Sequence, residues 1–524
     1  MILADPRGRA TATRIGGRIT LDELLRRAAA LRRPDALAVL DPPNREAVVG
    51  GKPRSLTYKQ AEHVVSAIAG RLRRMGLHTD GIVALQMANT VESLLTLLGV
   101  LRAGLIAMPL PALWRRSEMV AALSRVSPTA LIVSGRMGTT DHYALAMQVA
   151  AEIFRIRYVC GYSAGAPDGL VPFDNLFDMG KLDPIPAWGE ERAGDPGPTG
   201  HLAVITWDVG ADGLVPVARS HAELIAGGLA VMLESGLQQD CVLLSTLMSS
   251  SFAGLATGMI PWLLTGGTLA LHHPFDAHTY ANQLARIGCN AVVIPGQLSL
   301  QLSQCAASLP ERPTPDVIAV WRAPERLHRA SLWREKQGQI TDILIFGETA
   351  LLAARRGGGG KPAVIPFGVV SAPRAAKASI VAAEIAATPA GTVAIRGPMV
   401  PRAPFPPGAE RSSFPHLRVA PTGFVDTGYA SDPGLSAMVV TGSPPGMASV
   451  GGYRFVLSEV QEMLAGAQCG PATLTVLPDA LTGHRLSASA SDREGVEAEM
   501  ANLDTNPLVS GAFRERATRH PANT

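Results

Sequence analysis

Lysine is scarce in this chain, although basic residues as a class are not. Only six of the 47 basic residues are lysines, and no lysine follows Lys377. Chemistry that needs a lysine ammonium is therefore excluded from residues 378–524. The net charge is only +3, with acidic and basic residues interspersed, so no basic stripe indicates a nucleic-acid partner.

Cysteines and long apolar runs are also scarce. The five cysteines are widely spaced and form no Cys-x-x-Cys pair, which argues against zinc and for reduced thiols in a cytoplasm. The longest apolar stretch, 94–113, is interrupted by Arg102, Gly104 and two prolines, so no membrane span is expected. Residues 1–17 are polar and lack the apolar core of a signal peptide.

What the sequence does contain is enough apolar material for a large core. Its 524 residues are 47% hydrophobic and 17% charged, which predicts a globular protein of two or three lobes. Helix and strand patterns alternate: a helix after Thr57, a strand over 81–87, a helix over 90–103 and a strand over 105–108. This alternation predicts an α/β fold with a parallel sheet.

The stretch 203–223 combines a strand pattern with a helix start. An apolar β-branched run through Thr206 is followed by Asp208 and by the turn-forming residues Gly210, Asp212 and Gly213. Ser220-His221-Ala222-Glu223 is a capping box for the next helix. Two interpretations remain open here: a plain strand-loop-helix connection, or an anion site formed by loop amides and the helix N-terminus.

This stretch and several others resemble the adenylate-forming (AMP-binding) superfamily, which includes acyl-CoA and aryl-CoA synthetases. The segments LTYKQAEHVVSAIAGRLRRMGL and ALQMANTVESLLTLLGVLRAGLIAMPL are similar to the opening of such an enzyme, and Ser220-His221 closes a stretch similar to its phosphate loop. The resemblance implies a large N-terminal region of parallel α/β subdomains plus a small β-barrel element. It also implies a small, shortened α+β C-terminal lid. We expect the boundary at residues 440/441, with an adenylation domain over 1–440 and the lid over 441–524.

The resemblance assigns nucleotide roles to residues in three segments. Around the phosphates it implies Thr206, Asp208, Gly210, Asp212, Gly213 and His221. In ILIFGETA, Phe346 and Gly347 occupy the positions where relatives stack an aromatic ring on adenine. Glu348 and Thr349 resemble the catalytic pair of the family, which includes the magnesium-binding glutamate, but each lies one residue earlier than in the family pattern. Asp426 lies three residues before the position of the ribose-binding aspartate, which Tyr429 occupies.

The resemblance also implies an acyl pocket around residues 242–276. Ser251, Phe252 and Gly254 would form its floor, which we expect to be small and uncharged; the alternative is a core helix without ligand contact. Such a pocket favours an apolar or aromatic small-molecule carboxylate as substrate. By resemblance the cofactors would be ATP, Mg²⁺ and coenzyme A.

The chain departs from the family pattern where lysines and hinge charges are expected. Val215 stands at the loop lysine, and Gly442-Ser443-Pro444-Pro445-Gly446 replaces the charged hinge before the lid. Two hypotheses follow. One is an AMP-forming acyl or aryl carboxylate-CoA ligase. The other is a catalytically silent relative that binds an acyl group, an acyl-adenylate or a protein partner without adenylation.

Overall fold

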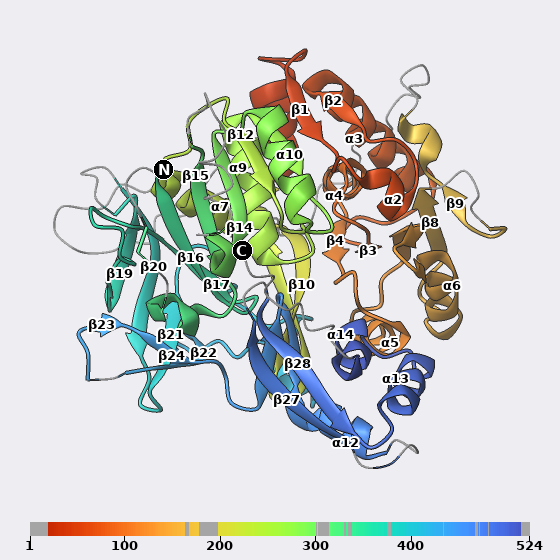
Figure 1. Cartoon of the computed structure of the whole chain (residues 1–524). Helices are drawn as coiled ribbons and strands as arrows, with labels where there is room; N and C mark the ends of the chain where they lie inside the picture. Colours follow the sequence, from red (N-terminus) through yellow and green to blue (C-terminus); the bar gives the residue numbers. More distant parts are fainter. Residues whose placement is uncertain are drawn as a thin grey trace, which may run out of the picture.

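Two mostly parallel β-sheets form the N-terminal part of the chain in the computed structural model (Figure 1). The structure describes residues 19–162, 167–177, 198–299, 301, 314–329, 332–333, 338–374, 379–432, 434–466, 470, 472–479 and 482–514. Cys305, Cys469, Lys181, Lys336, Lys377 and most of the connection 162–198 lie outside these residues.

The first sheet carries the strands that end at the candidate site. In spatial order its described strands are β17 (Ala350–Arg355), β16 (Ile340–Phe346), β15 (Asp316–Trp321), β14 (Ala291–Pro295), β12 (Val242–Ser245), β13 (Thr268–Leu271), β1 (Leu37–Leu40) and β2 (Ser55–Thr57). The inner strands pair in parallel, and β17 and β2 close the edges antiparallel. β16 is buried along its whole length, and its apolar sequence is interrupted only by Thr341 and by Asp342, which pairs with Arg356 at 2.7 Å.

The second sheet contains the strands predicted from helix-strand alternation. Its order is β11 (Gly213–Ser220), β10 (Leu202–Gly210), β4 (Ile106–Pro109), β3 (Ile82–Gln86), β5 (Ala130–Ser134), β8 (Tyr158–Tyr162) and β9 (Val171–Pro172). All neighbours pair in parallel except β10 and β11. The predicted parallel α/β architecture is confirmed.

Helices cover these sheets, and the helix α7 begins at the capping box predicted from the sequence. Their described bounds are α1 (Leu21–Glu23), α2 (Arg45–Val49), α3 (Tyr58–Arg74), α4 (Val91–Arg102), α5 (Arg116–Val126), α6 (His142–Glu152), α7 (His221–Ser235), α8 (Phe252–Gly254), α9 (Ile260–Thr265) and α10 (Ala277–Ile287). At α7 the Ser220 hydroxyl accepts from the Glu223 amide at 3.3 Å, and the Glu223 carboxylate accepts from the Ser220 amide at 2.8 Å. This is the predicted capping box.

The remaining strands build a third, antiparallel sheet and a separate C-terminal part. The third sheet runs β19 (Gly368–Ala372), β20 (Ile380–Ala387), β21 (Thr392–Arg396), β22 (Val425–Ser431) and β24 (Val440–Gly442), beside the short pair β18 (Ile365–Pro366) and β23 (Ala437–Met438); the pair β6 (Arg136–Met137) and β7 (Thr140–Asp141) precedes α6. The C-terminal part contains β25 (Met447–Val450), β26 (Tyr453–Val456), α12 (Leu457–Ala465), β27 (Ala472–Asp479), β28 (Gly483–Ala490), α13 (Arg493–Asn502) and α14 (Pro507–Ser510). It has its own apolar cluster, which includes Leu464, Val496 and Met500. In Figure 1 this part is blue, at the bottom of the view.

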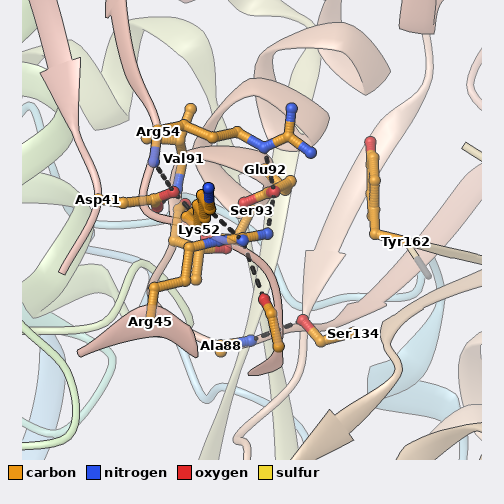
Figure 2. Close-up of polar contacts among 12 residues, drawn as sticks. Asp41, Arg45, Lys52, Arg54, Ala88, Val91, Glu92, Ser93, Ser134 and Tyr162 are labelled. Carbon is orange, nitrogen blue, oxygen red and sulfur yellow. Dashed lines mark hydrogen bonds and ion pairs between the residues drawn. The ribbon is translucent and has the colours of Figure 1, made fainter. Parts of the chain in front are cut away.

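A buried ionic network fixes the start of α4 against the N-terminal strand (Figure 2). The Asp41 carboxylate accepts from the Val91 amide at 2.7 Å and pairs with Arg45 Nε at 3.1 Å. The Glu92 carboxylate accepts from Arg45 and, at 2.9 Å, from Arg54 Nε. Two arginines balance two acids here; Asp41, Glu92 and Arg45 are buried, and the Arg54 side chain is 32% exposed.

The expected loop between strand and helix is replaced by a β-hairpin. Gly210, Asp212 and Gly213 were expected in a loop that connects a strand to the helix N-terminus, but residues 213–220 form β11, which pairs with β10 out to Gly210 and Gly213. The prediction of their place is therefore wrong. Gly213 has φ = +106°, a conformation that favours glycine at the hairpin tip. The loop amides consequently do not continue into the N-terminus of α7.

No helix among the described residues is long and apolar enough to cross a membrane.

Candidate functional site

A cavity of about 630 Å³ lies where the first sheet meets the C-terminal hairpin β25–β26. Residues that directly follow β12, β15 and β16, namely Thr246, Arg322 and Gly347, line it. The carboxyl ends of parallel strands are the usual place for a ligand site in an α/β sheet. Six residues predicted from the sequence line this cavity: Asp208, Asp212, Gly213, Ser251, Gly347 and Glu348.

Asp208 joins three segments at the inner end of the hairpin. Its carboxylate accepts from its neighbour Val209 at 2.8 Å and from the Glu348 amide at 2.7 Å, and it forms an ion pair with Arg454 of β26. Both side chains of this pair are 11% exposed. The turn that contains Glu348 can come this close to Asp208 because Gly347 has no side chain: a Cβ on Gly347 would lie 2.1 Å from Asp208 Oδ2.

Glu348 is a buried carboxyl group at the turn after β16. Its Oε2 accepts from the Phe252 amide at 2.6 Å. Burial, more than any other cause, raises the pKa of Glu348 to about 7, against the lowering effect of the Phe252 amide. Near neutral pH this group therefore exchanges between its neutral and charged forms.

Arg219 of β11 supports the Glu348 turn from the side of the core. Its guanidinium donates to the Glu348 carbonyl and, at 2.8 Å, to the Thr349 carbonyl. The guanidinium lies 3.9 Å from the centre of the Phe252 ring. Burial lowers the pKa of Arg219 to about 10, so it stays charged at neutral pH. Phe252 is fully buried under this cation, as in a core helix.

The floor of the cavity carries a charge, contrary to the prediction of an uncharged floor. Ser251 caps α8 by accepting from the Gly254 amide at 3.3 Å, and its hydroxyl also accepts from Arg322 at 3.0 Å. Gly254 does not line the cavity; a Cβ there would lie 1.8 Å from the Met248 carbonyl oxygen. The glycine serves close packing of the backbone.

Two aromatic residues lie beside the Asp208–Arg454 ion pair. Phe346 is 1% exposed and meets the Tyr429 ring edge-on at 5.4 Å, while Tyr429 lines the cavity. The Arg454 guanidinium lies 5.8 Å from the centre of the Tyr429 ring. Phe346 is not among the lining residues, so its ring is not presented to the cavity in this arrangement.

The tip of the C-terminal hairpin closes one side of the cavity. Gly451 and Gly452 have φ of +58° and +97°, and the Gly451 carbonyl accepts from Arg322 at 3.1 Å. Next to them the Tyr453 hydroxyl accepts from the Leu113 amide at 3.2 Å. The hairpin β25–β26 thereby contacts Leu113, which follows β4 of the second sheet, and Arg322, which follows β15 of the first sheet.

The other predicted residues lie away from the cavity lining. Thr206 is buried in β10, where its hydroxyl helps to lower the pKa of Glu348. The His221 ring accepts from the Leu21 amide at 3.3 Å, which ties α7 to the N-terminal helix. The Asp426 carboxylate is exposed and accepts from the Gly428 amide at 2.9 Å, a turn-capping contact. Gly210 and Thr349 are likewise outside the lining.

The acidic groups fit a magnesium ion that is shared with substrate, and do not form an all-protein cage. The described residues contain no group of three or more histidine, cysteine or acidic side chains placed to hold a metal. Magnesium usually takes one or two carboxylates together with phosphate oxygens and water. Among the lining carboxylates Asp208 and Asp212 are paired with arginines, and Glu348, once ionised, is one that would hold such an ion.

Four functional candidates were missed from the sequence: Arg219, Arg322, Tyr453 and Arg454. Arg322 follows a strand end, which is a weak signal that could have found it. The other three are recognised only by contacts across long sequence separations.

Comparison with known proteins gives a consistent family. The model of the family described as AMP-binding enzyme matches residues 35–312. Salicylyl-CoA synthase / salicylate adenylyltransferase from Streptomyces sp. is 28% identical over 229 residues, which is 43% of this chain and 40% of that protein. A 2-hydroxy-7-methoxy-5-methyl-1-naphthoate–CoA ligase from Streptomyces carzinostaticus is 25% identical over 46% of this chain and 42% of its own. The alignments thus span about two fifths of these relatives.

Solved structures show the same fold along nearly the whole chain. The amide bond synthetase McbA from Marinactinospora thermotolerans has a TM-score of 0.66 at 19% identity and covers 94% of each chain. The o-succinylbenzoate CoA synthetase from Bacillus subtilis has a TM-score of 0.65 at 15% identity, with 93% of each chain covered. The expected fold, with a large N-terminal and a small C-terminal domain, is confirmed.

Proposed function

The chain belongs to the AMP-binding enzyme family, and we propose that its cavity binds an aryl or acyl carboxylate for ATP-dependent activation and transfer to the thiol of coenzyme A. The observation that carries this proposal is the convergence of six predicted residues from three separate segments on one cavity. Its volume of about 630 Å³ lies within the range of small-ligand sites. Two matched relatives are named for aromatic carboxylates, which supports an aryl acid as the first substrate to try.

The reaction has two steps. In the first, a carboxylate oxygen attacks the α-phosphorus of ATP, the bond to pyrophosphate breaks, and an acyl-adenylate forms. In the second, the thiol sulfur attacks the acyl carbon, the thiol proton is released, and AMP leaves. Most of the first step is positioning and charge neutralisation. In this chain Glu348 would hold Mg²⁺, and the Asp208–Arg454 pair would open to offer Arg454 to the phosphates.

A silent relative is the second candidate, and one observation favours it. None of the described residues that line the cavity is a lysine, and the lining cation Arg454 already forms an ion pair with Asp208. A protein of this kind would bind an acyl group or acyl-adenylate without forming one. Losing one donor to a developing charge costs about 3 kcal/mol or more of transition-state stabilisation.

Pyrophosphate exchange distinguishes the two candidates. The purified chain is incubated with ATP, Mg²⁺, labelled pyrophosphate and one carboxylic acid at a time: salicylate, benzoate, a medium-chain fatty acid, phthalate, isophthalate or glutarate. Carboxylate-dependent exchange that is lost in Glu348→Gln would support the ligase. A cooperatively melting protein without exchange for any acid would refute adenylation and leave the silent relative.

A further inference from the structure

Arg322 is a cation in the cavity that the proposed adenylation chemistry does not use. It follows β15, lines the cavity, and its guanidinium donates to Ser251 Oγ at 3.0 Å and to the Gly451 carbonyl at 3.1 Å. These two contacts come from opposite walls, so the guanidinium is fixed in place between the floor and the C-terminal hairpin. Its Nε is buried and has no hydrogen-bond partner.

The charge of Arg322 is not balanced by a described carboxylate. Asp208 pairs with Arg454, and Asp212 pairs with Arg418 at the rim, whereas Arg322 forms no ion pair with any acid in the described residues. Glu348 acts on Arg322 only from a distance and forms no ion pair with it. A buried charge without a partner is costly, and an incoming anion would remove that cost.

The hairpin approaches Arg322 with the backbone of Gly452, which has no side chain. A Cβ on Gly452 would lie 1.5 Å from Arg322 Nη1, so only glycine permits this approach. Leu247, Met248 and Ala253, which also line the cavity, are apolar, and Arg322 Nε is buried. Water is thus partly excluded around a planar donor group, which strengthens a charge-assisted hydrogen bond.

One uncompensated positive charge with a single hydroxyl beside it fits a monoanion better than a polyphosphate, which needs several donors. A carboxylate matches the planar fork of a guanidinium. The reacting carboxylate is a poor candidate, because it becomes an uncharged acyl group on activation and would leave Arg322 unpaired again in every turnover. A second acidic group keeps its charge throughout both steps.

Resting on the proposed function, we propose that Arg322 binds a second carboxylate of the substrate, so that the acids this cavity accepts are dicarboxylic acids. One carboxylate contacts Arg322 and Ser251, and the other faces the Asp208–Glu348 side, where activation takes place. The apolar lining between them takes the carbon skeleton.

The test compares diacids with their half-amides, which have the same shape and one charge fewer. Calorimetric titration without ATP uses isophthalate against 3-carbamoylbenzoate, phthalate against 2-carbamoylbenzoate, and glutarate against its half-amide. At least one diacid should bind tenfold or more tightly than its half-amide. This preference should fall to within about twofold in Arg322→Gln and be partly kept in Arg322→Lys, which preserves the charge. Arg33→Gln, which removes a surface guanidinium outside the cavity, should leave the preference unchanged.

Other outcomes would overturn the inference. Two of these are a diacid preference that survives in Arg322→Gln and the absence of any preference in the unaltered protein. An equal loss of benzoate binding in Arg322→Gln would place the reacting carboxylate on Arg322. A selective loss of AMP or pyrophosphate binding in that variant would place a phosphate there. Circular dichroism melting checks that both Arg322 variants fold. If Arg322→Gln does not fold, Arg322→Lys still tests the inference. Loss of the bidentate guanidinium should weaken binding of the diacid and leave binding of the half-amide unchanged. Because these titrations contain no ATP, a diacid preference without pyrophosphate exchange would contradict the ligase and keep the binding inference.

Discussion

Replacing Asp208 by asparagine should release the C-terminal hairpin from the rest of the protein. Asp208 and Arg454 are each 11% exposed, and the Asp208 carboxylate also accepts from two backbone amides at 2.7 and 2.8 Å. Asparagine keeps one acceptor oxygen and removes the charge, which leaves Arg454 largely buried without a counterion. Breaking a buried pair from one side typically costs about 3 kcal/mol or more.

Hydrogen exchange measures this loss locally. A change of about 3 kcal/mol in the free energy of opening corresponds to a roughly 100-fold faster amide exchange. We expect this acceleration in a peptide that covers residues 447–456, while peptides from β3 and β5 keep their protection. The matched control is Asp212→Asn, which lies with Asp208 in the hairpin β10–β11. The side chains of Asp212 and Arg418 are 69% and 80% exposed, and such surface pairs contribute little to stability.

The reasoning would be refuted if Asp208→Asn and Asp212→Asn accelerated exchange of residues 447–456 to the same extent. A double-mutant cycle with Arg454→Gln then isolates the pair itself. The coupling between Asp208→Asn and Arg454→Gln should be about 1 to 3 kcal/mol, as for contacting residues of one network. A coupling near zero would mean that Asp208 acts through its backbone contacts alone.

Two further predictions concern buried charges. The pKa of Glu348 is raised to about 7 from an ordinary value of 4.5, so the folded state binds more protons than the unfolded state between these pH values, and stability should fall as pH rises through this window. Glu348→Gln should flatten that slope in urea titrations at pH 5 to 8, and a slope unchanged by the substitution would contradict the assignment. Because only the ionised carboxylate binds Mg²⁺, the Mg²⁺ affinity of the ATP-bound protein should increase up to tenfold for each unit by which the pH is raised toward 7. Arg45→Met should lower the free energy of unfolding by about 3 to 5 kcal/mol at pH 7, because it leaves two buried carboxylates with one arginine. The loss should be smaller at pH 5, because burial raises the pKa of Asp41 to about 6 and the protonated Asp41 no longer needs a counterion. Arg116→Met, which breaks an ion pair whose side chains are 52% and 37% exposed, is its control and should change the stability by less than about 1 kcal/mol.

The fold was predictable from the sequence to a considerable extent. The helix expected from Thr57 is α3, in which Thr57 is the N-cap and Gln60 completes the capping box. The strands expected over 81–87 and 105–108 are β3 and β4, paired in parallel. These elements are specified by residues a few positions apart, whose apolar spacing and capping side chains act within one helix or strand.

The candidate site was predictable in its parts and not in its assembly. Asp208, Ser251 and Glu348 were identified one at a time by resemblance, and the structure brings them to one cavity. The loop expected before α7 is a hairpin instead, because residues 213–220 gain a partner strand in β10, and strand pairing over eight residues outweighs the local turn signal. The uncharged floor was wrong because Arg322 comes from a distant segment.

The sequence by itself determined the family, the parallel α/β architecture and the places where lysine is missing. Those properties depend on local patterns and on the identity of single residues. Only the tertiary structure decided which charges meet. Arg454 and Asp208 are separated by 246 residues, and Arg322 and Gly451 by 129. Such contacts depend on how the sheets and the C-terminal part pack together, and burial at those contacts then sets which groups are paired, neutral or left to bind a ligand.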